Sequence, residues 1–304
     1  MKLVLANSQA QNYTDFYARV QADNPDLFDY TLFADLLFSF GGAKPISVRN
    51  IATGRELQDY DGIYIKSYST SYELAATVAI CCEALHIPLM DHELVSPPSL
   101  SKLSGYAKLA AAGVSVPETI AGTTSAITRA LKPLSADFFP AVLKRASADR
   151  GRDNYMVQSK RDITELLEPH NPDSVWLLQR HIANDGFYRI TFNAGELAFC
   201  IFRKLEPRSD GDPRKAHMYK PNSGSNATLL KSHEVPPEVL AESEKAAKAM
   251  DRQMAGVDCL FDAAHKMAYV LEVNNNPQLV STSTFQDVRI AAFVESLKKD
   301  WKQI

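Results

Sequence analysis

The sequence predicts an α/β fold in its N-terminal part and an α+β arrangement in its C-terminal part. Short apolar runs alternate with helical patterns near the N-terminus, whereas hairpin signals dominate later in the chain. Hydrophobic residues make up 45% and charged residues 23% of the 304 residues, as in ordinary globular proteins. At roughly 100–200 residues per domain, a chain of this length is expected to form about two domains.

Charge and hydropathy exclude several classes of partner. Lys and Arg number 33 against 36 Asp and Glu, for a net charge of -3, which is too balanced for a protein that neutralises many nucleic-acid phosphates. The apolar start Leu3–Ala6 breaks at Asn7, and no stretch approaches the ~18 apolar residues of a membrane span. We therefore expect a cytoplasmic protein without nucleic-acid or membrane partners. Four cysteines lack zinc-ligand spacing and are expected to be reduced: Cys81, Cys82, Cys200 and Cys259.

The first part of the chain has the pattern of a parallel α/β unit. Three short apolar segments are expected to form buried strands: residues 2–6, 63–65 and 86–90. We expect helices between the first two strands, and the Ala- and Leu-rich segment 72–85 has the spacing of a further helix. Strand, helix and strand in this order favour parallel pairing. The Pro- and Ser-rich stretch 96–99 then marks a domain boundary.

A capped helix and several strands are expected after this boundary. Ser101 can cap a helix that continues to Ala112 and stops at Gly113. Apolar runs predict strands at 139–144 and 176–179. A hairpin is predicted from residues 188–192 and 197–202, with its turn at Asn193-Ala194-Gly195.

The C-terminal third begins with a polar segment. Residues 207–228 contain few apolar residues and are expected to form a long loop, of the kind that is usually functional or disordered. From Pro236 the pattern predicts a helix that runs to Met254 and is closed by Gly256. The remaining expected elements are strands at 257–261 and 267–273 and an amphipathic helix at 285–301.

The most informative stretch is AGVDCLFDAAHKMAYVLEVNNNP, residues 255–277. If residues 262–266 form the turn of a hairpin, Asp258 lies about opposite Glu272, with Cβ atoms ~4.5–5.5 Å apart. Two carboxylates at that distance repel unless a cation lies between them. Asn274 follows two residues later and so shares the face of Glu272. Two carboxylates and an amide oxygen form a site that suits Mg²⁺.

These carboxylates also have a simpler interpretation. Asp258 and Glu272 can lie on the solvent-exposed face of an edge hairpin, where most strand carboxylates lie. The hairpin geometry alone leaves the two interpretations even, because a small shift of the boundaries changes the register. Apolar residues occupy both faces of the strand at 257–261, and a carboxylate within such a strand favours the metal site.

The motif AGVD, followed by a hairpin and then LEVNNNP, resembles the AGVD and xEVNxxP motifs of ATP-grasp ligases. The sequence resembles the RimK-type glutamate ligases most, and glutathione synthetase and D-alanine:D-alanine ligase more distantly. The resemblance implies that Asp258, Glu272 and Asn274 bind two Mg²⁺ ions, with Mn²⁺ as an alternative. The three domains that it implies are an N-terminal α/β pre-ATP-grasp domain at 1–95 and the two lobes of the ATP-grasp fold, the central lobe at 96–183 and the C-terminal lobe at 184–304.

Further landmarks occur upstream in the order of this family. KLSGYAKLAAAGVSVPET is similar to the segment whose lysine reaches the nucleotide phosphates, which assigns that role to Lys102. FPAVLK is similar to the strand before the phosphate-covering flap, so Lys144 takes the second phosphate-binding position. The flap has one glycine where relatives have several, and its closure would depend on Ser147 and on Arg150 or Arg152.

The hinge strand and the second hairpin complete the resemblance. WLLQRHI is similar to the strand whose backbone reads adenine in the family. The ATP-binding residues implied here are Gln179, Arg180, His181, Ile182 and Asp185. Arg189 and Arg203 have the spacing of two family arginines that face the γ-phosphate and the acyl substrate. Arg203 would stabilise the transferred phosphoryl group and the later oxyanion, and Arg189 would orient the acyl substrate.

The function implied by the resemblance is the ATP-dependent joining of a carboxylate to an amine through an acyl phosphate. The expected cofactors are ATP and Mg²⁺, and the substrate carboxylate and amine belong to small molecules or peptides. Assembly as a homo-oligomer, either a dimer or a tetramer, stays open. Two other functions also stay open: a nucleotide-binding regulatory protein that has kept the fold but lost catalysis, and an ATP-grasp phosphotransferase.

Overall fold

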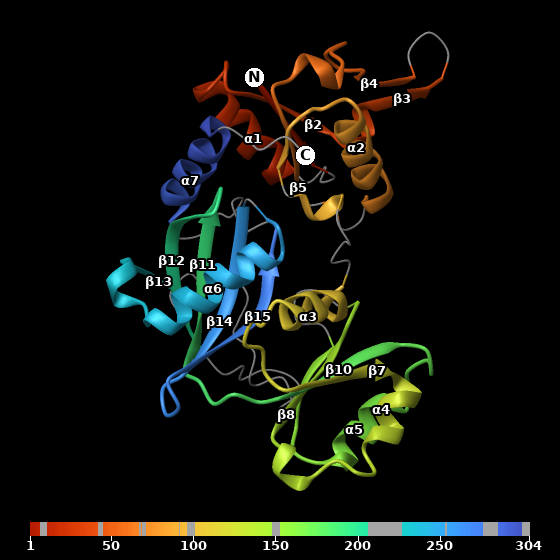
Figure 1. Ribbon diagram of the computed structural model, residues 1–304, viewed down its shortest axis with the longest axis vertical. Helices are drawn as coiled ribbons and strands as arrows, with labels where there is room; N and C mark the ends of the chain where they lie inside the picture. The colour runs from red at the N-terminus through yellow and green to blue at the C-terminus, as the bar shows by residue number, and fades with distance from the viewer. Residues whose placement is uncertain are drawn as a thin grey trace.

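The computed structural model describes residues 1–6, 11–41, 45–66, 68, 71–90, 92–95, 101–147, 153–205, 227–252, 254–275 and 285–299. Three sheet-containing regions follow one another along the long axis of the molecule (Figure 1). The N-terminal region lies at one end, a five-stranded sheet lies in the middle, and a four-stranded sheet lies at the other end. The predicted mixed α/β class is confirmed.

The N-terminal region is a parallel sheet with strand order β2-β1-β5-β6. Helix α2 covers the face of Leu3 and Ile63, while helix α1 covers the face of Val4 and Tyr64. The predicted parallel pairing is therefore confirmed. The elements are β1 (Lys2–Ala6), α1 (Gln11–Asp23), β2 (Phe28–Leu32), β5 (Ile63–Lys66), α2 (Tyr72–Ala84) and β6 (Leu89–Met90).

One expectation for this region was incomplete and another was wrong in extent. Helix α1 lies between the first two predicted strands, as expected, but β2 and an antiparallel hairpin of β3 (Leu36–Phe40) and β4 (Ile46–Asn50) also lie there and were not predicted. Aromatic and β-branched residues in these segments favour strands. The strand expected at 86–90 is reduced to β6, because His86 has a φ of 55° and Pro88 has no N–H to donate.

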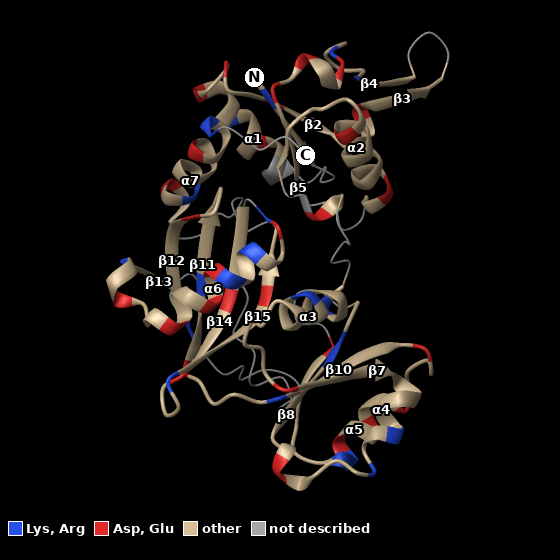
Figure 2. Ribbon diagram, in the orientation of Figure 1, with Lys and Arg blue, Asp and Glu red and all other residues tan. Residues whose placement is uncertain are grey.

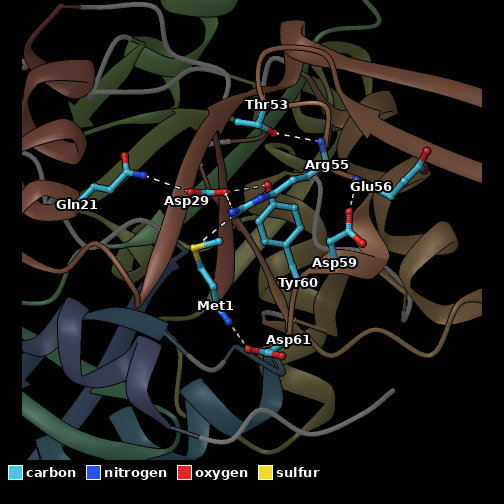
Figure 3. Close-up of polar contacts among 9 residues, drawn as sticks. All are labelled: Met1, Gln21, Asp29, Thr53, Arg55, Glu56, Asp59, Tyr60 and Asp61. Atoms are coloured by element: carbon cyan, nitrogen blue, oxygen red, sulfur yellow. Dashed lines mark hydrogen bonds and ion pairs between the residues drawn. The ribbon is translucent and has the colours of Figure 1, made fainter.

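A polar cluster stabilises the outer edge of this sheet (Figure 3). Asp29 on β2 accepts hydrogen bonds from Arg55 Nη1 at 2.7 Å and from Tyr60 Oη at 2.9 Å. Gln21 of α1 donates to the other Asp29 oxygen at 3.3 Å, and the N-terminal ammonium pairs with Asp61. These contacts connect α1 and the segment before β5 to the edge strand β2.

The four-stranded sheet has strand order β7-β10-β8-β9 and is antiparallel. Helices α4 and α5 cover the face that carries Leu143, Trp176 and Leu178. By strand alternation, Lys144 and Gln179 lie on the opposite face. The elements are β7 (Thr119–Thr123), α4 (Thr124–Ala130), β8 (Ala141–Arg145), β9 (Asn154–Val157), α5 (Lys160–Leu167) and β10 (Val175–Arg180).

The five-stranded sheet has strand order β13-β12-β11-β14-β15. Helix α6 packs on the face of Ile190, Cys200 and Val257, so the residues between them point to the opposite face. The β11–β12 hairpin turns through Ala194 and Gly195, both with positive φ, as predicted. The elements are β11 (Gly186–Asn193), β12 (Glu196–Lys204), β13 (Ala227–Leu230), α6 (Pro237–Ala249), β14 (Met254–Asp262) and β15 (Met267–Asn274).

The helix expected to run to Met254 was wrong in its extent. Helix α6 ends at Ala249, the chain turns at Asp251 with a φ of 53°, and Met254 already pairs with Asn193 in the sheet. Pairing with β11 outweighs the local helical pattern. Most of the loop expected at 207–228 lies outside the described residues, and its last two residues belong to β13.

Two helices connect these regions. Helix α3 (Lys102–Ala111) lies between the five-stranded and the four-stranded sheet, with Ser101 as its N-cap and Gly113 at a φ of 69° after its end, as predicted. Helix α7 (Gln286–Lys298) lies beside α1 although it comes from the end of the chain (Figure 1). Its Phe293 packs against Tyr17, Phe28 and Tyr64.

Two simple features accompany this fold. All four cysteines are buried and free of disulfides. Among the described residues, no helix is long and apolar enough to cross a membrane.

Candidate active site

Four charged side chains form a row across one face of the five-stranded sheet. Asp258 on β14 pairs with Arg189 on one side and with Glu272 on the other. Arg203 on β12 lies opposite Phe187, which is two residues from Arg189. Paired residues and residues two apart share a face, so all four charges point away from α6. The predicted opposition of Asp258 and Glu272 is confirmed.

A β-bulge produces this opposition. The hairpin closes with Asp262 opposite Met267, and a regular ladder from that pair would place Leu271 opposite Asp258. The register shifts between Asp258 and Cys259, so Glu272 takes that place instead. A shift of one residue reverses the face of every side chain beyond it. The bulge therefore brings Glu272 to the face of Asp258.

Arg189 and Asp258 form a buried bidentate ion pair. Arg189 Nε lies 2.6 Å from Asp258 Oδ1, and Nη2 lies 2.5 Å from Oδ2. Their side chains are only 7% and 8% exposed. The planar guanidinium fixes both carboxylate oxygens, while each oxygen retains further lone pairs for another ligand. Arg189 thus holds the Asp258 carboxylate in a fixed orientation.

The two carboxylates differ in their affinity for a proton. Burial raises the pKa of Asp258 to about 6, and the neighbouring Glu272 charge adds to this effect. Partial loss of hydration also raises the pKa of Glu272, but Arg189, Asn274 and Asp258 together outweigh it, and the net pKa is lowered. Asp258 therefore takes up a proton at a higher pH than Glu272 does. A divalent cation beside the two carboxylates would stabilise both in their ionised form.

Asn274 completes an oxygen-rich group. Its Nδ2 donates to Glu272 Oε1 at 3.1 Å and to the Gly256 carbonyl at 3.4 Å, so its Oδ1 is turned away from both acceptors. Among the described residues no three acidic, His or Cys side chains gather as a metal site. Two carboxylates and one amide oxygen nevertheless fit Mg²⁺, which uses few protein ligands and completes its shell with water and phosphates.

The edge of β15 that does not pair with β14 receives hydrogen bonds from two side chains outside the sheet. Tyr106 of α3 donates its hydroxyl to the Leu271 carbonyl at 2.8 Å. Arg252 Nη1 donates to the Val273 carbonyl, and its Nε pairs with Glu93 Oε2 at 2.7 Å. These two contacts flank Glu272 in the chain. Sequence analysis missed Tyr106, Arg252 and Glu93 because each acts through a contact distant in sequence.

The facing wall comes from α3 and the four-stranded sheet. Lys144 Nζ donates to Gln179 Oε1 at 2.6 Å, and Gln179 Nε2 donates to Thr119 Oγ1 at 2.9 Å. Burial lowers the pKa of Lys144 to about 8, with Glu272 opposing and Lys102 assisting this shift. Lys102, Lys144 and Glu272 therefore come together although they lie on α3, β8 and β15. We call this group, with Tyr106 and Gln179, the interlobe site.

Figure 2 shows the arrangement of charge in this region, with acidic segments of β14 and β15 beside the basic start of α3. Tyr106 lies one helical turn after Lys102 and so shares its face. The four-residue spacing of Lys102 and Tyr106 on a predicted helix is the sequence signal that could have indicated Tyr106. Arg252 has no comparable signal in the sequence around it.

Other predicted nucleotide-binding residues lie around the end of β10. Arg180 points to the face opposite Gln179, where Nε pairs with Glu118 Oε2 at 3.0 Å and the guanidinium lies 5.4 Å from the Phe138 ring centre. His181 donates its backbone N–H to the Pro140 carbonyl at 3.0 Å, and burial lowers its pKa. Of the three remaining predicted residues, Ile182 and Asp185 follow the end of β10, and Ser147 follows the end of β8. Arg150 and Arg152 lie outside the described residues.

The chain was also compared with known proteins. Residues 100–296 match the model of the RimK-like ATP-grasp domain. No curated protein sequence matches the chain.

Several solved structures have the same fold at low sequence identity. A RiPP-associated ATP-grasp ligase of Chryseobacterium gregarium, in complex with ADP and a leader and core peptide, is 12% identical, with 100% of this chain and 99% of that chain covered and a TM-score of 0.67. The ATP-grasp ligase PsnB, complexed with a minimal precursor, Mg and ADP, is 14% identical over 97% and 96%, with a TM-score of 0.65. D-alanine–D-alanine ligase from Bacillus anthracis is 17% identical over 98% and 94%, with a TM-score of 0.63.

Proposed function

Because the chain belongs to the RimK-like ATP-grasp family, we propose that it is an ATP-dependent ligase that joins a carboxylate to an amine. The observation that carries this proposal is the meeting of Asp258, Glu272 and Asn274 with Lys102 and Lys144 between two sheets. Hard oxygen ligands facing two ammonium groups suit a metal-bound polyphosphate. That two similar structures hold ADP, one of them with Mg, supports ATP and Mg²⁺ as the cofactors.

The proposed reaction has two steps. An oxygen of the substrate carboxylate attacks the γ-phosphorus of ATP, the bond to the β-phosphate breaks, and ADP leaves. The amine then attacks the carbonyl carbon of the acyl phosphate, loses a proton, and displaces phosphate. The product is an amide or peptide bond, and each turnover consumes one ATP.

Each side of the site has an assigned task. Asp258, Glu272 and Asn274 would hold Mg²⁺, which supplies charge neutralisation to the phosphate oxygens. Lys102 and Lys144 bind the phosphates from the opposite wall. The exposed Ser147, two residues after the end of β8, is assigned to the flap that covers the phosphates.

The arginines and the end of β10 act on the transferred group and on the base. Arg203 stabilises the transferred phosphoryl group and the later oxyanion. Arg189 uses two of its five N–H donors on Asp258, and we assign the orientation of the acyl substrate to the same guanidinium. The adenine is assigned to the end of β10 and the segment after it: Gln179, Arg180, His181, Ile182 and Asp185.

We also propose domain boundaries on the same basis. The pre-ATP-grasp domain covers residues 1–95, the central lobe 96–183 and the C-terminal lobe 184–304. Each of the three ranges contains one complete main sheet. The substrates are proposed to be an amino acid or peptide carboxylate and an amine.

Mass spectrometry can identify the reaction. The protein is incubated with ATP, Mg²⁺ and an extract of metabolites and peptides, and the Glu272→Gln variant is the matched control. We expect a new mass equal to the sum of two extract components minus water, in the wild-type sample alone. No consumption of ATP would favour a regulatory protein, and a product heavier by one phosphate would favour a phosphotransferase.

A further inference from the structure

The side chain of Gln179 is the point at which the polar contacts of the interlobe site converge. It is only 2% exposed. Thr119 on β7 lies directly opposite Gln179 in the sheet. Lys144 on β8 lies opposite Leu177, two residues before Gln179 on β10. The three polar side chains therefore share the face of the sheet that lies away from α4 and α5, within reach of one another.

The hydrogen bond between Gln179 and Thr119 has a fixed direction. Gln179 Nε2 lies 2.9 Å from Thr119 Oγ1, and the Thr119 hydroxyl lies 2.7 Å from the Pro117 carbonyl oxygen. A carbonyl oxygen can only accept, so the hydroxyl proton of Thr119 is directed to Pro117. The Thr119 oxygen must then accept from Gln179, which places the NH₂ end of the amide on this side.

Tyr106 imposes the same orientation from α3. Its hydroxyl donates to the Leu271 carbonyl on β15 at 2.8 Å, which again directs the proton to a backbone oxygen. A side-chain hydrogen bond also joins Tyr106 to Gln179, and Gln179 must be its donor because the hydroxyl proton is already used. An amide NH₂ group has two N–H donors, so Thr119 and Tyr106 together account for both.

Lys144 contacts the other end of the amide. Because the NH₂ group faces the two hydroxyls, Gln179 Oε1 is turned toward the Lys144 ammonium and lies 2.6 Å from Nζ. The ammonium has three N–H donors, and this contact uses one of them and orients the others. A lysine that is already held in one conformation loses less entropy when a ligand binds.

We propose that the Gln179 side chain is a positioning residue that holds Lys144 ready for the phosphates of ATP, with Thr119 and Tyr106 fixing the orientation of its amide. The role rests on the proposed function, because that function assigns the phosphates to Lys144. The adenine assigned to the end of β10 would meet the backbone there, not this side chain. Replacing Gln179 should therefore weaken the binding of the polyphosphate and leave recognition of the base unchanged.

A double-mutant cycle separates this role from a purely structural one. Calorimetry measures the affinity for ATP with Mg²⁺ in wild type, Gln179→Met, Lys144→Met and the double variant. Methionine has nearly the length of glutamine but lacks the amide. We expect Gln179→Met to bind ATP about 3–30-fold more weakly than wild type, the range set by the freedom that an unrestrained lysine loses on binding. In the Lys144→Met background the same substitution should change the affinity by less than about 2-fold.

Variants of the hydroxyl partner test the orientation of the amide. Thr119→Val removes the hydroxyl at nearly constant shape and should also weaken ATP binding, whereas Thr119→Ser keeps the hydroxyl and should restore it. Gln158→Met is the matched control, because Gln158 is an exposed glutamine that follows β9 in the same sheet, and it should bind ATP as wild type does. Circular dichroism confirms that each variant is folded. Thr119→Val takes the place of Gln179→Met in the cycle if the latter does not fold.

A second nucleotide distinguishes the positioning of Lys144 from a contact with the base. Purine riboside triphosphate lacks the 6-amino group of adenine, which is the group that the Gln179 oxygen could accept from. Gln179→Met should weaken its binding by the same factor as that of ATP. Turnover is followed in parallel with a pool of carboxylic acids and hydroxylamine, which traps an activated acid as a hydroxamate.

An equal loss of ATP affinity from Gln179→Met in the wild-type and Lys144→Met backgrounds would overturn the proposal. So would wild-type affinity in Gln179→Met, or a loss for ATP that is absent for purine riboside triphosphate. A wild-type protein that binds no ATP would refute both the positioning role and the proposed function. Coupling of Gln179 to Lys144 in ATP binding, without hydroxamate, would support the positioning role and refute the ligase reaction.

Discussion

Replacing Arg252 by methionine is predicted to destabilise the protein and weaken its use of Mg²⁺. Arg252 connects Glu93, in the segment after β6, to the Val273 carbonyl between two proposed metal ligands. Both charged side chains are buried, at 6% exposure for Arg252 and 1% for Glu93. Methionine keeps much of the length of the side chain but removes every hydrogen bond. The variant therefore tests the ionic contact more than the packing.

The size of the expected stability loss follows from the Glu93 carboxylate, which Arg252→Met leaves buried without its ion-pair partner. Arg252 Nε and Nη2 lie 2.7 and 2.6 Å from Glu93 Oε2, and both contacts disappear in the variant. Breaking a buried ion pair by removing one partner costs about 3–5 kcal/mol. Burial already raises the pKa of Glu93 against the lowering effect of Arg252, so its pKa rises further in the variant. A carboxyl group with a raised folded-state pKa destabilises the fold above its unfolded-state pKa, and the loss should be larger at pH 8 than at pH 5.

Urea unfolding measures the loss, and a second substitution checks its cause. Adding Glu93→Gln to Arg252→Met removes the uncompensated charge, so the double variant should be more stable than Arg252→Met alone. Because the Val273 carbonyl still lacks its donor, the double variant should keep the raised Mg²⁺ requirement for turnover. The reasoning is refuted if Arg252→Met unfolds within about 1 kcal/mol of wild type, well below the cost of an unpaired buried charge. It is also refuted if Glu93→Gln gives no recovery.

Three further variants test the interlobe site. Burial lowers the pKa of Lys144 to about 8, so ATP affinity measured by calorimetry should fall as pH rises through 8, because the phosphates bind the protonated lysine. Lys144→Met should lack this dependence and bind ATP weakly at pH 7. Lys102→Met should also weaken ATP binding, and the fall with pH should remain but move to higher pH, because the Lys102 charge lowers the pKa of Lys144. Wild-type affinity in both variants would make these lysines ordinary charges. Glu272→Gln should lose nearly all Mg²⁺-dependent turnover with little change in melting temperature, whereas wild-type turnover would rule out Glu272 as a metal ligand.

Local signals in the sequence were sufficient for much of the fold. The Ser101 cap and the positive-φ glycines at Gly113 and Gly195 depend on residues within one turn of each other, and the structure confirms them. The parallel N-terminal sheet follows from the order of its elements. Helix α6 shows the limit, because Met254 continues an apolar helical pattern but pairs with Asn193 on β11 instead.

The candidate active site was also predictable only in part from the sequence. The opposition of Asp258 and Glu272 was predicted from a hairpin, yet it depends on a bulge that the sequence does not reveal. The contact of Arg252 with Glu93 joins residues 159 positions apart, and no local pattern encodes such a pairing.

Phosphorus-31 NMR tests the central claim most directly, because it distinguishes the fates of the three ATP phosphates in one experiment. The protein is supplied with ATP, Mg²⁺, hydroxylamine and a pool of carboxylic acids that includes acidic peptides. Carboxylate activation through an acyl phosphate predicts ADP and inorganic phosphate in equal amounts, matched by hydroxamate and absent without the acids. The appearance of AMP and pyrophosphate, or of a stable phosphoester resonance, would contradict it.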